Sequence, residues 1–391
     1  MEVDGIIFDS TFLVYILVMA NERRKIVLIL GNGFDLDLGL KTSYKDFWES
    51  EFCPKDFPAP IIHHLNRRWP DNLDAVKWYD LENELLNYYK GLHNLKDGED
   101  ILTDDEKDFL KIFTPYGFRC RWYDDKLELL QSLVEKGVLL YRDRGIPSID
   151  EHYKEDALKS PIWRDKKALV LIKKGLCNYL NSVVLPHSFT LTIAYQTLAL
   201  LDEEALNGHF VNVYTFNYTP VRLMGRAPDA AKVYHVHGSC ADGKIIIGTR
   251  DDQAFVPTYD FLQKSFDPAF NPPALVEDLK DADEVVIFGH SIGENDRQYF
   301  KSFFKQQTDY VHPCRKTITI FTRDDESEVQ IKRSLQSMTD GSLSTLYGLN
   351  NIQIIKTGNI KEDQSKLYDF LVKHGKKELA AREFIGKLIK Q

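Results

Sequence analysis

The stretch KIVLILGNGFD occupies Lys25–Asp35. Its first six residues form a short apolar run with β-branched side chains, which predicts a buried strand. Gly31 and Gly33 end this run and predict a tight turn into a helix. In a parallel sheet such a turn lies at the carboxyl ends of the strands, where open α/β folds bind ligands. We therefore expect both the fold and a candidate site to centre on this stretch.

Further strands are indicated much later in the chain. Helical patterns separate several of them, for example Asp296–Gln306 and Glu326–Met338. Strands that alternate with helices predict an α/β, Rossmann-like fold with a mostly parallel sheet covered on both faces. The expected strands are Phe210–Thr215, Lys232–Val236, Lys244–Ile247, Glu284–Phe288, Thr317–Phe321 and Ile352–Ile355.

The domain organisation follows from where the strand patterns are sparse. Long, aromatic, helical segments such as Trp78–Leu92 and Lys166–Leu185 dominate residues 44–207, which we interpret as a large helical insertion. The Rossmann-like core, which carries the expected ligand site, would then comprise residues 25–43 and 208–360. Residues 361–391 are predicted to form a C-terminal helical tail, in which Lys373–Gln391 is an amphipathic, surface-packed helix. Binding of nucleic acid or membrane by that tail is the lesser alternative.

Residues 1–24 form an N-terminal extension with two open interpretations. The apolar run Thr11–Ala20 is too short for a membrane span, which needs about twenty residues. Acidic rather than basic residues precede it, so a secretory signal is not indicated. Either translation starts at Met19, or the segment is an element packed on the core.

Composition narrows the class of protein. The 391 residues carry a formal net charge of −9, which argues against a general duplex-DNA binder. The five cysteines form no Cys-x-x-Cys pair, so free thiols in the cytoplasm are expected. We expect a cytoplasmic protein with neither a membrane nor nucleic acid as its partner.

The glycine turn at Gly31 and Gly33 has two readings. Glycines let a backbone approach a phosphate, and the helix start that follows offers unpaired amides to it. Leu36, however, stands where the standard dinucleotide fingerprint has its last glycine. Nucleotide binding and a plain strand-to-helix turn therefore both stay open.

Two polar motifs leave the next strands. Thr215–Thr219 reads TFNYT, and its Asn217 could orient a water or a hydroxyl. His235–Ser239 reads HVHGS, and its His237 could serve as a general base. The two histidines could share a metal, but no further ligand has a matching spacing, so no metal is expected. Alternatively, both motifs only satisfy loop backbones.

A third polar segment, Gly289–Asp296, reads GHSIGEND and lies at another strand-to-helix junction. Ser291 and Asp296 could cap the helix that follows or contact a ligand. The segment also fits the pattern of a hydrolase nucleophile, but such enzymes need a later acid followed by a histidine. Neither His312 nor His374 suits that role, so a catalytic serine is disfavoured.

In the insertion, Asp80 and Glu82 stand at the start of a helix. Their negative charges could interact favourably with the positive end of the helix dipole, or one of the carboxylates could project into the expected ligand site.

Taken together, these motifs resemble the AbiH family of phage abortive-infection proteins over Lys25 to Ile355. The resemblance implies a role in phage defence, with a phage-derived trigger and a homo-oligomer as further expectations. The motifs are GNGFDLDLGLKTSYKDF (Gly31–Phe47), WYDLE (Trp78–Glu82), TFNYT, HVHGS, IIIGTRDD (Ile245–Asp252) and GHSIGENDRQYF (Gly289–Phe300).

A more distant resemblance is to sirtuin-like domains. It implies that Gly31 and Gly33 hold a dinucleotide phosphate, that Asn217 lies beside the nicotinamide ribose and that His237 is catalytic. It also places Gly289–Ser291 near a ribose. This chain departs from sirtuins in having Asn32 between the glycines and Thr219 in place of an acid. The zinc-binding cysteine pairs of deacylases are absent from the sequence too, so cleavage of NAD fits better than deacylation.

These resemblances lead to one functional hypothesis, that the protein binds NAD or a related nucleotide and hydrolyses its N-glycosidic bond. The alternatives are a nucleotide-binding sensor without turnover and a nuclease that uses Asp251, Asp252 and the basic tail. The candidate catalytic residues are Asn217, His237, Asp35 and Glu82. The candidate nucleotide-binding residues are Gly31, Asn32, Gly33, Phe34, Thr215, Gly289, Ser291 and Asp296.

Overall fold

The computed structural model describes residues 23–69, 80–91, 103–112, 127–135, 140–142, 146–148, 161–184, 186, 189–222, 227–251 and 255–390. Several sequence-based expectations lie outside these residues. They concern Met19 and the rest of residues 1–22, Trp78, Tyr79, Cys120 and Asp252.

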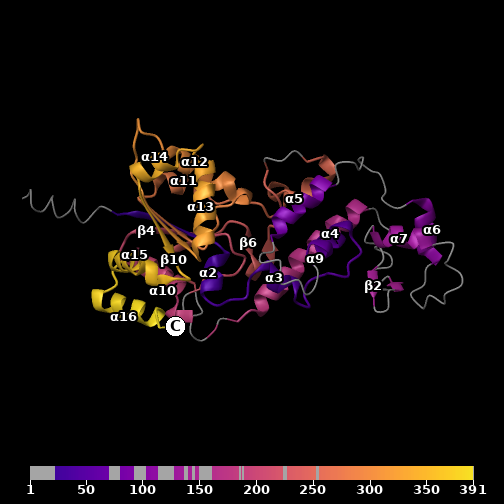
Figure 1. Cartoon of the computed structure of the whole chain (residues 1–391), viewed down its shortest axis with the longest axis horizontal. Helices are drawn as coiled ribbons and strands as arrows, with labels where there is room; N and C mark the ends of the chain where they lie inside the picture. Colours follow the sequence, from indigo (N-terminus) through magenta and orange to yellow (C-terminus); the bar gives the residue numbers. More distant parts are fainter. Residues whose placement is uncertain are drawn as a thin grey trace, which may run out of the picture.

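Six strands pair in one parallel sheet, in the order β10-β9-β8-β1-β4-β5 (Figure 1). Counted along the chain within this sheet, the order is 6-5-4-1-2-3, which is the doubly wound Rossmann order. The predicted α/β fold with a parallel sheet is therefore confirmed. The strands are β1 (Lys25–Leu30), β4 (Phe210–Thr215), β5 (Lys232–His235), β8 (Glu284–Phe288), β9 (Thr317–Thr322) and β10 (Asn351–Lys356).

One predicted strand does not join this sheet. Residues 244–247 contribute only β7 (Lys244–Ile245), which pairs antiparallel with β6 (Gly238–Ser239) in a separate ribbon. The reason is the backbone at Gly238, where a φ of +77° turns the chain away from the direction of β5. The short helix η4 (Cys240–Asp242) then closes the ribbon.

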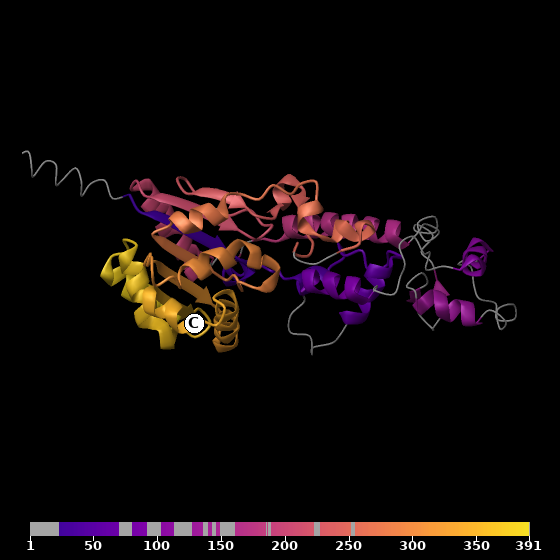
Figure 2. The same ribbon diagram turned by 90° about the horizontal axis from the view of Figure 1, so that it is seen from above.

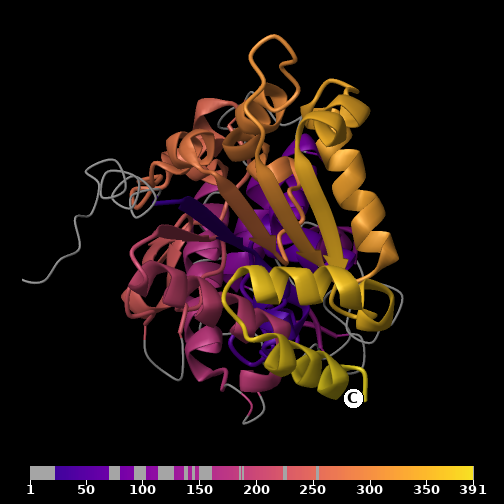
Figure 3. The same ribbon diagram turned by 90° about the vertical axis from the view of Figure 1, so that its left-hand side faces the viewer.

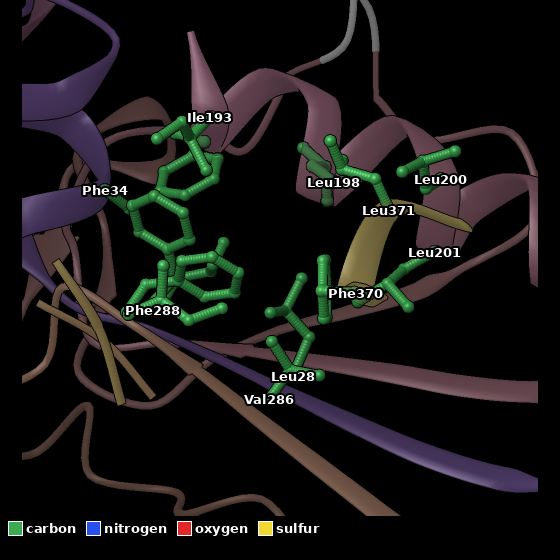
Figure 4. Close-up of a cluster of buried hydrophobic side chains, with 14 of the residues drawn as sticks. Leu28, Phe34, Ile193, Leu198, Leu200, Leu201, Val286, Phe288, Phe370 and Leu371 are labelled. Atoms are coloured by element: carbon green, nitrogen blue, oxygen red, sulfur yellow. The ribbon is translucent and has the colours of Figure 1, made fainter. Parts of the chain in front are cut away.

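The strands of the main sheet alternate their side chains between two apolar layers. Ile26, Leu28 and Leu30 of β1 enter one layer, and Val27 and Ile29 enter the other. Figure 4 shows Leu28 beside side chains of the first layer, and Figure 3 shows helices on both faces of the sheet. The first layer holds α10 (Ile193–Leu206), α15 (Ile360–Lys373) and α16 (Glu378–Leu388); the second holds α11 (Leu275–Asp281), α12 (Arg297–Gln306), α13 (Asp325–Met338) and α14 (Leu343–Leu349).

Register places the ends of the central strands level with one another. Leu30 pairs with both Thr215 and Phe288, and Thr215 pairs with His235. The segments that follow β1, β4, β5 and β8 therefore all leave the sheet at one edge. This edge includes the point where the strand order reverses, which is where doubly wound folds bind ligands.

The helical insertion extends beyond this carboxyl edge and has a core of its own (Figures 1 and 2). Trp48, Leu85 and Ile172 are buried in that core together with Ile245 and Leu262, which follow the sheet strand β5 in sequence. Insertion and sheet domain thus share an apolar interface. The main helices of the insertion are α3 (Tyr44–Trp48), α4 (Pro60–Arg68), α5 (Leu81–Gly91) and α9 (Pro161–Ser182), and α6 (Asp104–Ile112), α7 (Leu127–Glu135), β2 (Leu140–Arg142) and β3 (Ile146–Ser148) lie farther out.

Two boundaries differ from those we expected. Helix α10 falls within the predicted insertion, yet Leu198 and Leu201 pack in the same layer as Leu28, so α10 belongs to the sheet domain. Its apolar, helical pattern does not reveal which core it joins. In the tail, the helix expected over Lys373–Gln391 begins only at Glu378 as α16, because α15 runs to Lys373 and Gly375, with a φ of +92°, separates the two helices. Phe384 and Ile385 of α16 are buried against that same layer.

Two further observations concern membranes and thiols. None of the helices that the structure describes combines the length and apolar character needed to cross a bilayer. Cys53, Cys177, Cys240 and Cys314 are free thiols, as predicted.

Candidate active site

The glycine turn after β1 packs backbone to backbone against the turn after β8. A Cβ placed on Gly31 would lie 2.5 Å from Cα of His290, and one on Gly33 would lie 2.6 Å from Cα of Gly289. Gly289 itself has a φ of +65°, a conformation that favours glycine. The glycines of both turns are therefore required by this close contact, whatever ligand binds nearby.

The amides of the glycine turn are largely engaged by the protein itself. Gly31 donates to the carbonyl of Phe288 at 3.0 Å, and Gly33 donates to that of Gly289 at 2.9 Å. Phe34 donates to the carbonyl of Gly31 at 2.9 Å. Phosphate binding by this turn stays a prediction, and these bonds limit the donors that the turn can offer.

A first polar cluster joins the glycine turn to the end of β4. The side-chain amide of Asn217 donates to the carboxylate of Asp35 at 3.1 Å and to the carbonyl of Gly31 at 3.0 Å. The hydroxyl of Thr219 donates to the other carboxylate oxygen of Asp35. Thr215 is buried, and its hydroxyl oxygen accepts a bond from the backbone N–H of Asn217 at 3.1 Å, which orients the turn.

Asp35 is only 4% exposed. Burial raises its pKa to about 6, although the bonds from Thr219 and Asn217 act in the opposite direction. At neutral pH the group is thus a carboxylate held mainly by neutral donors. Such a group presents a negative charge in surroundings of low polarity.

A second polar cluster surrounds Asp296, which lies at the end of η7 (Glu294–Asp296). One carboxylate oxygen of Asp296 lies 2.9 Å from Nε2 of His237 and 3.0 Å from Nζ of Lys264. The other oxygen lies 3.3 Å from Nε2 of His290. Lys264 Nζ also lies 3.0 Å from a carboxylate oxygen of Glu82, which comes from the insertion helix α5. Four separate chain segments therefore meet at this cluster.

Neighbouring groups indicate the protonation of two members of the Asp296 cluster. Nδ1 of His290 accepts a bond from the amide of Ile292 at 2.9 Å, so its proton is on Nε2 and is donated to Asp296. Burial would raise the pKa of Asp296, but Lys264, followed by the donors of His237 and His290, holds that pKa well below its usual range. Asp296 is therefore ionised.

His237 is 3% exposed, and its burial, with Lys264 adding to the effect, lowers its pKa to about 4. The imidazole is neutral near pH 7. Because Asp296 is ionised and is its nearest partner, Nε2 carries the proton and donates it. Among the described residues, the buried Nδ1 of His237 has no hydrogen-bond partner. This leaves a free lone pair on an oriented histidine.

The two polar clusters are neighbours through Phe216. Its ring lies 5.3 Å from that of His237 and 4.3 Å from that of His290, measured between centroids. Phe216 directly precedes Asn217 in sequence. The loop that carries His290 is strained, since Ile292 has a φ of +51°, and such strain is common at functional sites.

The structure resolves several of the alternatives for single residues. Asp80 accepts a bond from the amide of Asn83 at 3.0 Å, a helix-start role, whereas Glu82 projects to Lys264. Asp296 occupies the N-cap position of α12 but makes no capping bond within the described chain, because its carboxylate turns to the second polar cluster. Ser291 is exposed on the loop after β8.

Two of the candidate nucleotide-binding side chains have structural partners. Phe34 is buried in the sheet's apolar layer, where its ring packs edge to face on Phe288 (Figure 4). Asn32 accepts a bond from the hydroxyl of Thr42 at 2.7 Å.

Sequence reasoning missed Lys264 and His290. Lys264 is the first residue of the second of two short 3-10 helices, η5 (Pro257–Leu262) and η6 (Lys264–Phe266), and is completely buried. No periodic pattern marks a lysine in such a stretch. Its ammonium lies between the carboxylates of Glu82 and Asp296 and the imidazole of His237. In the described part of the chain, no group of three or more metal-ligand side chains is found.

Comparison with known families shows which family the chain resembles. The profile of the family described as Bacteriophage abortive infection AbiH matches residues 27–317. The chain belongs to the AbiH family. The matched range includes Asp35, Glu82, Asn217, His237 and Asp296, so both polar clusters lie in the AbiH region, which is associated with phage abortive infection. No curated protein matches the chain.

Proposed function

We propose that this AbiH protein acts in phage defence by binding NAD or a related nucleotide at the carboxyl edge of the sheet and hydrolysing its N-glycosidic bond. The proposal rests chiefly on the His237–Asp296 pair. A neutral histidine that is oriented by a carboxylate, with its second nitrogen unpaired, is the arrangement of a general base. Its position beside a buried carboxylate at a Rossmann ligand edge supports nucleotide chemistry.

In the reaction we propose, the bond between C1′ of the ribose and the nicotinamide nitrogen breaks. Its electron pair leaves with the nicotinamide, and the sugar becomes a cation. A water oxygen then bonds to C1′ while one water proton passes to Nδ1 of His237 and later to solvent. The products are nicotinamide, ADP-ribose and one proton.

The first polar cluster supplies the charge that this step needs. A fixed carboxylate next to the sugar stabilises its developing positive charge. Asp35 suits that role better than Glu82, because the Glu82 carboxylate is already paired with Lys264. The side-chain amide of Asn217 would hold the Asp35 carboxylate in place, and the edge of that amide would face the ribose.

The decisive experiment incubates the purified full-length protein with NAD and follows nicotinamide by chromatography. We expect release by the wild type and loss of release in His237→Ala. His312→Ala is the matched control, because His312 is an exposed histidine with a side chain 84% accessible. Release that persists at the wild-type rate in His237→Ala would contradict the assigned role of His237.

The non-catalytic sensor gives a different result in the same experiment. Such a protein would bind the nucleotide, measured by calorimetry, and yield no nicotinamide over hours, with or without lysate from phage-infected cells. That outcome would mean that the protein binds the nucleotide at the same edge of the sheet without hydrolysing it. Metal-dependent cutting of DNA or RNA would instead point to a nuclease.

A further inference from the structure

Lys264 has an environment that is unusual for a lysine. Its side chain has no exposed surface, and its Nζ lies within 3.2 Å of three groups on different segments. These groups are Glu82 of the insertion, Asp296 after β8 and Nε2 of His237 after β5. A buried lysine without a function costs desolvation that an apolar residue would avoid.

The charges around His237 explain what this ammonium does. An isolated His–Asp pair favours the imidazolium, because a carboxylate at 2.9 Å stabilises a positive ring. Here Asp296 is already paired with Lys264, and a protonated His237 would place a second positive charge 3.2 Å from Nζ. Among the described residues, His290 and Tyr299 are further titratable groups that face His237. Neither adds a negative charge at neutral pH.

We propose that Lys264 is a positioning residue that neutralises Asp296, so that this carboxylate orients His237 through Nε2–H while Nδ1 stays unprotonated. A carboxylate partner normally both orients a histidine ring and increases its affinity for a second proton. Lys264 leaves the first effect of Asp296 on His237 and cancels the second. Glu82 holds the ammonium from the opposite side and brings the insertion into this arrangement. The use of Nδ1 as a base rests on the proposed function, whereas the state of the imidazole does not.

The state of the imidazole can be read directly by NMR on the full chain labelled with ¹⁵N-histidine. Nitrogen shifts distinguish the two neutral tautomers and the imidazolium, and His237→Gln assigns the signals. In the wild type we expect Nε2 protonated, Nδ1 bare and the ring neutral down to about pH 4. A wild type with the proton on Nδ1, or with an ordinary midpoint, would overturn the proposal.

Two substitutions then test Lys264 itself. Lys264→Met should raise the midpoint of His237 by about one to three pH units, because Asp296 loses its other cation. Lys264→Arg keeps the charge and should keep the midpoint low. An unchanged midpoint in folded Lys264→Met would refute the role of Lys264. If Lys264→Met does not fold, the wild-type tautomer and Lys264→Arg decide, since an ordinary midpoint in the arginine variant counts against the proposal.

The two proposals fail in different ways. Should no variant or wild type release nicotinamide, hydrolysis is wrong, and the titration of His237 still reports on Lys264. If hydrolysis is found, the acid limb of its pH profile should move upward in Lys264→Met and return in Lys264→Arg. A merely structural lysine would lower the rate without moving that limb.

Discussion

Asn217 and Asp35 are 182 positions apart in sequence and are joined by a hydrogen bond of 3.1 Å in the protein interior. The bond ties the end of β4 to α2 (Asn32–Asp37), which directly follows β1. The same amide reaches the carbonyl of Gly31, so one side chain holds both parts of the β1 turn. The site is therefore built from the strand ends themselves, so the bonds of Asn217 should contribute to the stability of the fold.

We expect Asn217→Ala to lower the free energy of unfolding by about 1–3 kcal/mol, since a buried carboxylate and a buried carbonyl each lose a donor. Urea unfolding at pH 7 measures the change. Asn207→Ala is the control, because Asn207 is exposed at the end of α10 and should change stability by no more than about 0.5 kcal/mol. Equal effects of the two substitutions would show that the Asn217 bonds contribute little.

A buried histidine away from the site should make stability depend on pH. His374 is fully buried between Glu204 at 3.1 Å and Glu284 at 3.2 Å. Burial would lower its pKa, but the bonds to these carboxylates outweigh burial and raise it. A raised pKa stabilises the fold fully below pH 6.5, and this contribution is lost as the pH rises through the folded-state value.

His374→Gln should therefore remove part of the decline in stability as the pH rises above 6.5. Urea midpoints measured across this range for wild type and variant provide the test. His312→Gln, at an exposed position, should follow the wild type. Parallel curves for the wild type and His374→Gln would contradict the prediction.

Replacing glycine by alanine should have opposite effects on stability at Gly33, which lies in the contact between the two glycine turns, and at Gly348, which lies outside it. Gly33→Ala should destabilise by about 1–3 kcal/mol, because the new methyl group would meet the backbone of Gly289. Gly348→Ala lies in α14 with nothing within 4 Å and should stabilise by about 0.5–1 kcal/mol. Thermal unfolding of both variants provides the comparison. A stable Gly33→Ala protein would mean that the two turns can separate.

Family membership gives a prediction in cells. Expression of the wild-type chain should reduce plaque formation by a sensitive phage, and His237→Ala should restore plaques if turnover is the effector step. Immunoblotting confirms equal protein levels, and His312→Ala should protect like the wild type. Protection by His237→Ala would separate the defence from the chemistry proposed for this histidine.

The sheet could be predicted from sequence because its strands are continuous apolar runs. Lys25–Leu30, Phe210–Thr215 and Glu284–Phe288 were each expected with the bounds observed. Buried parallel strands have this signature, since both of their faces are covered. The short run at Lys244 has a similar composition, but the chain turns at Gly238 and the run pairs in a separate antiparallel ribbon.

The site was less accessible to sequence reasoning. Asn217 and His237 were singled out because polar motifs follow strand ends, and the structure places each in a buried polar cluster. Asp296 could equally well have been a helix cap, because its identity and position suit both roles. Lys264 gave no signal, because its meaning depends on contacts with Glu82 and Asp296 that only the fold creates.

The backbone contact between Gly33 and Gly289 has a mechanical consequence. With no side chain between them, the turns after β1 and β8 cannot slide apart without breaking the bond from Gly33 to the carbonyl of Gly289. Asp35 is attached to the first turn, and Asp296 follows the second. A displacement of one turn therefore displaces the other at this contact, so the backbone segments that lead to Asp35 and to Asp296 are mechanically coupled where they leave the sheet.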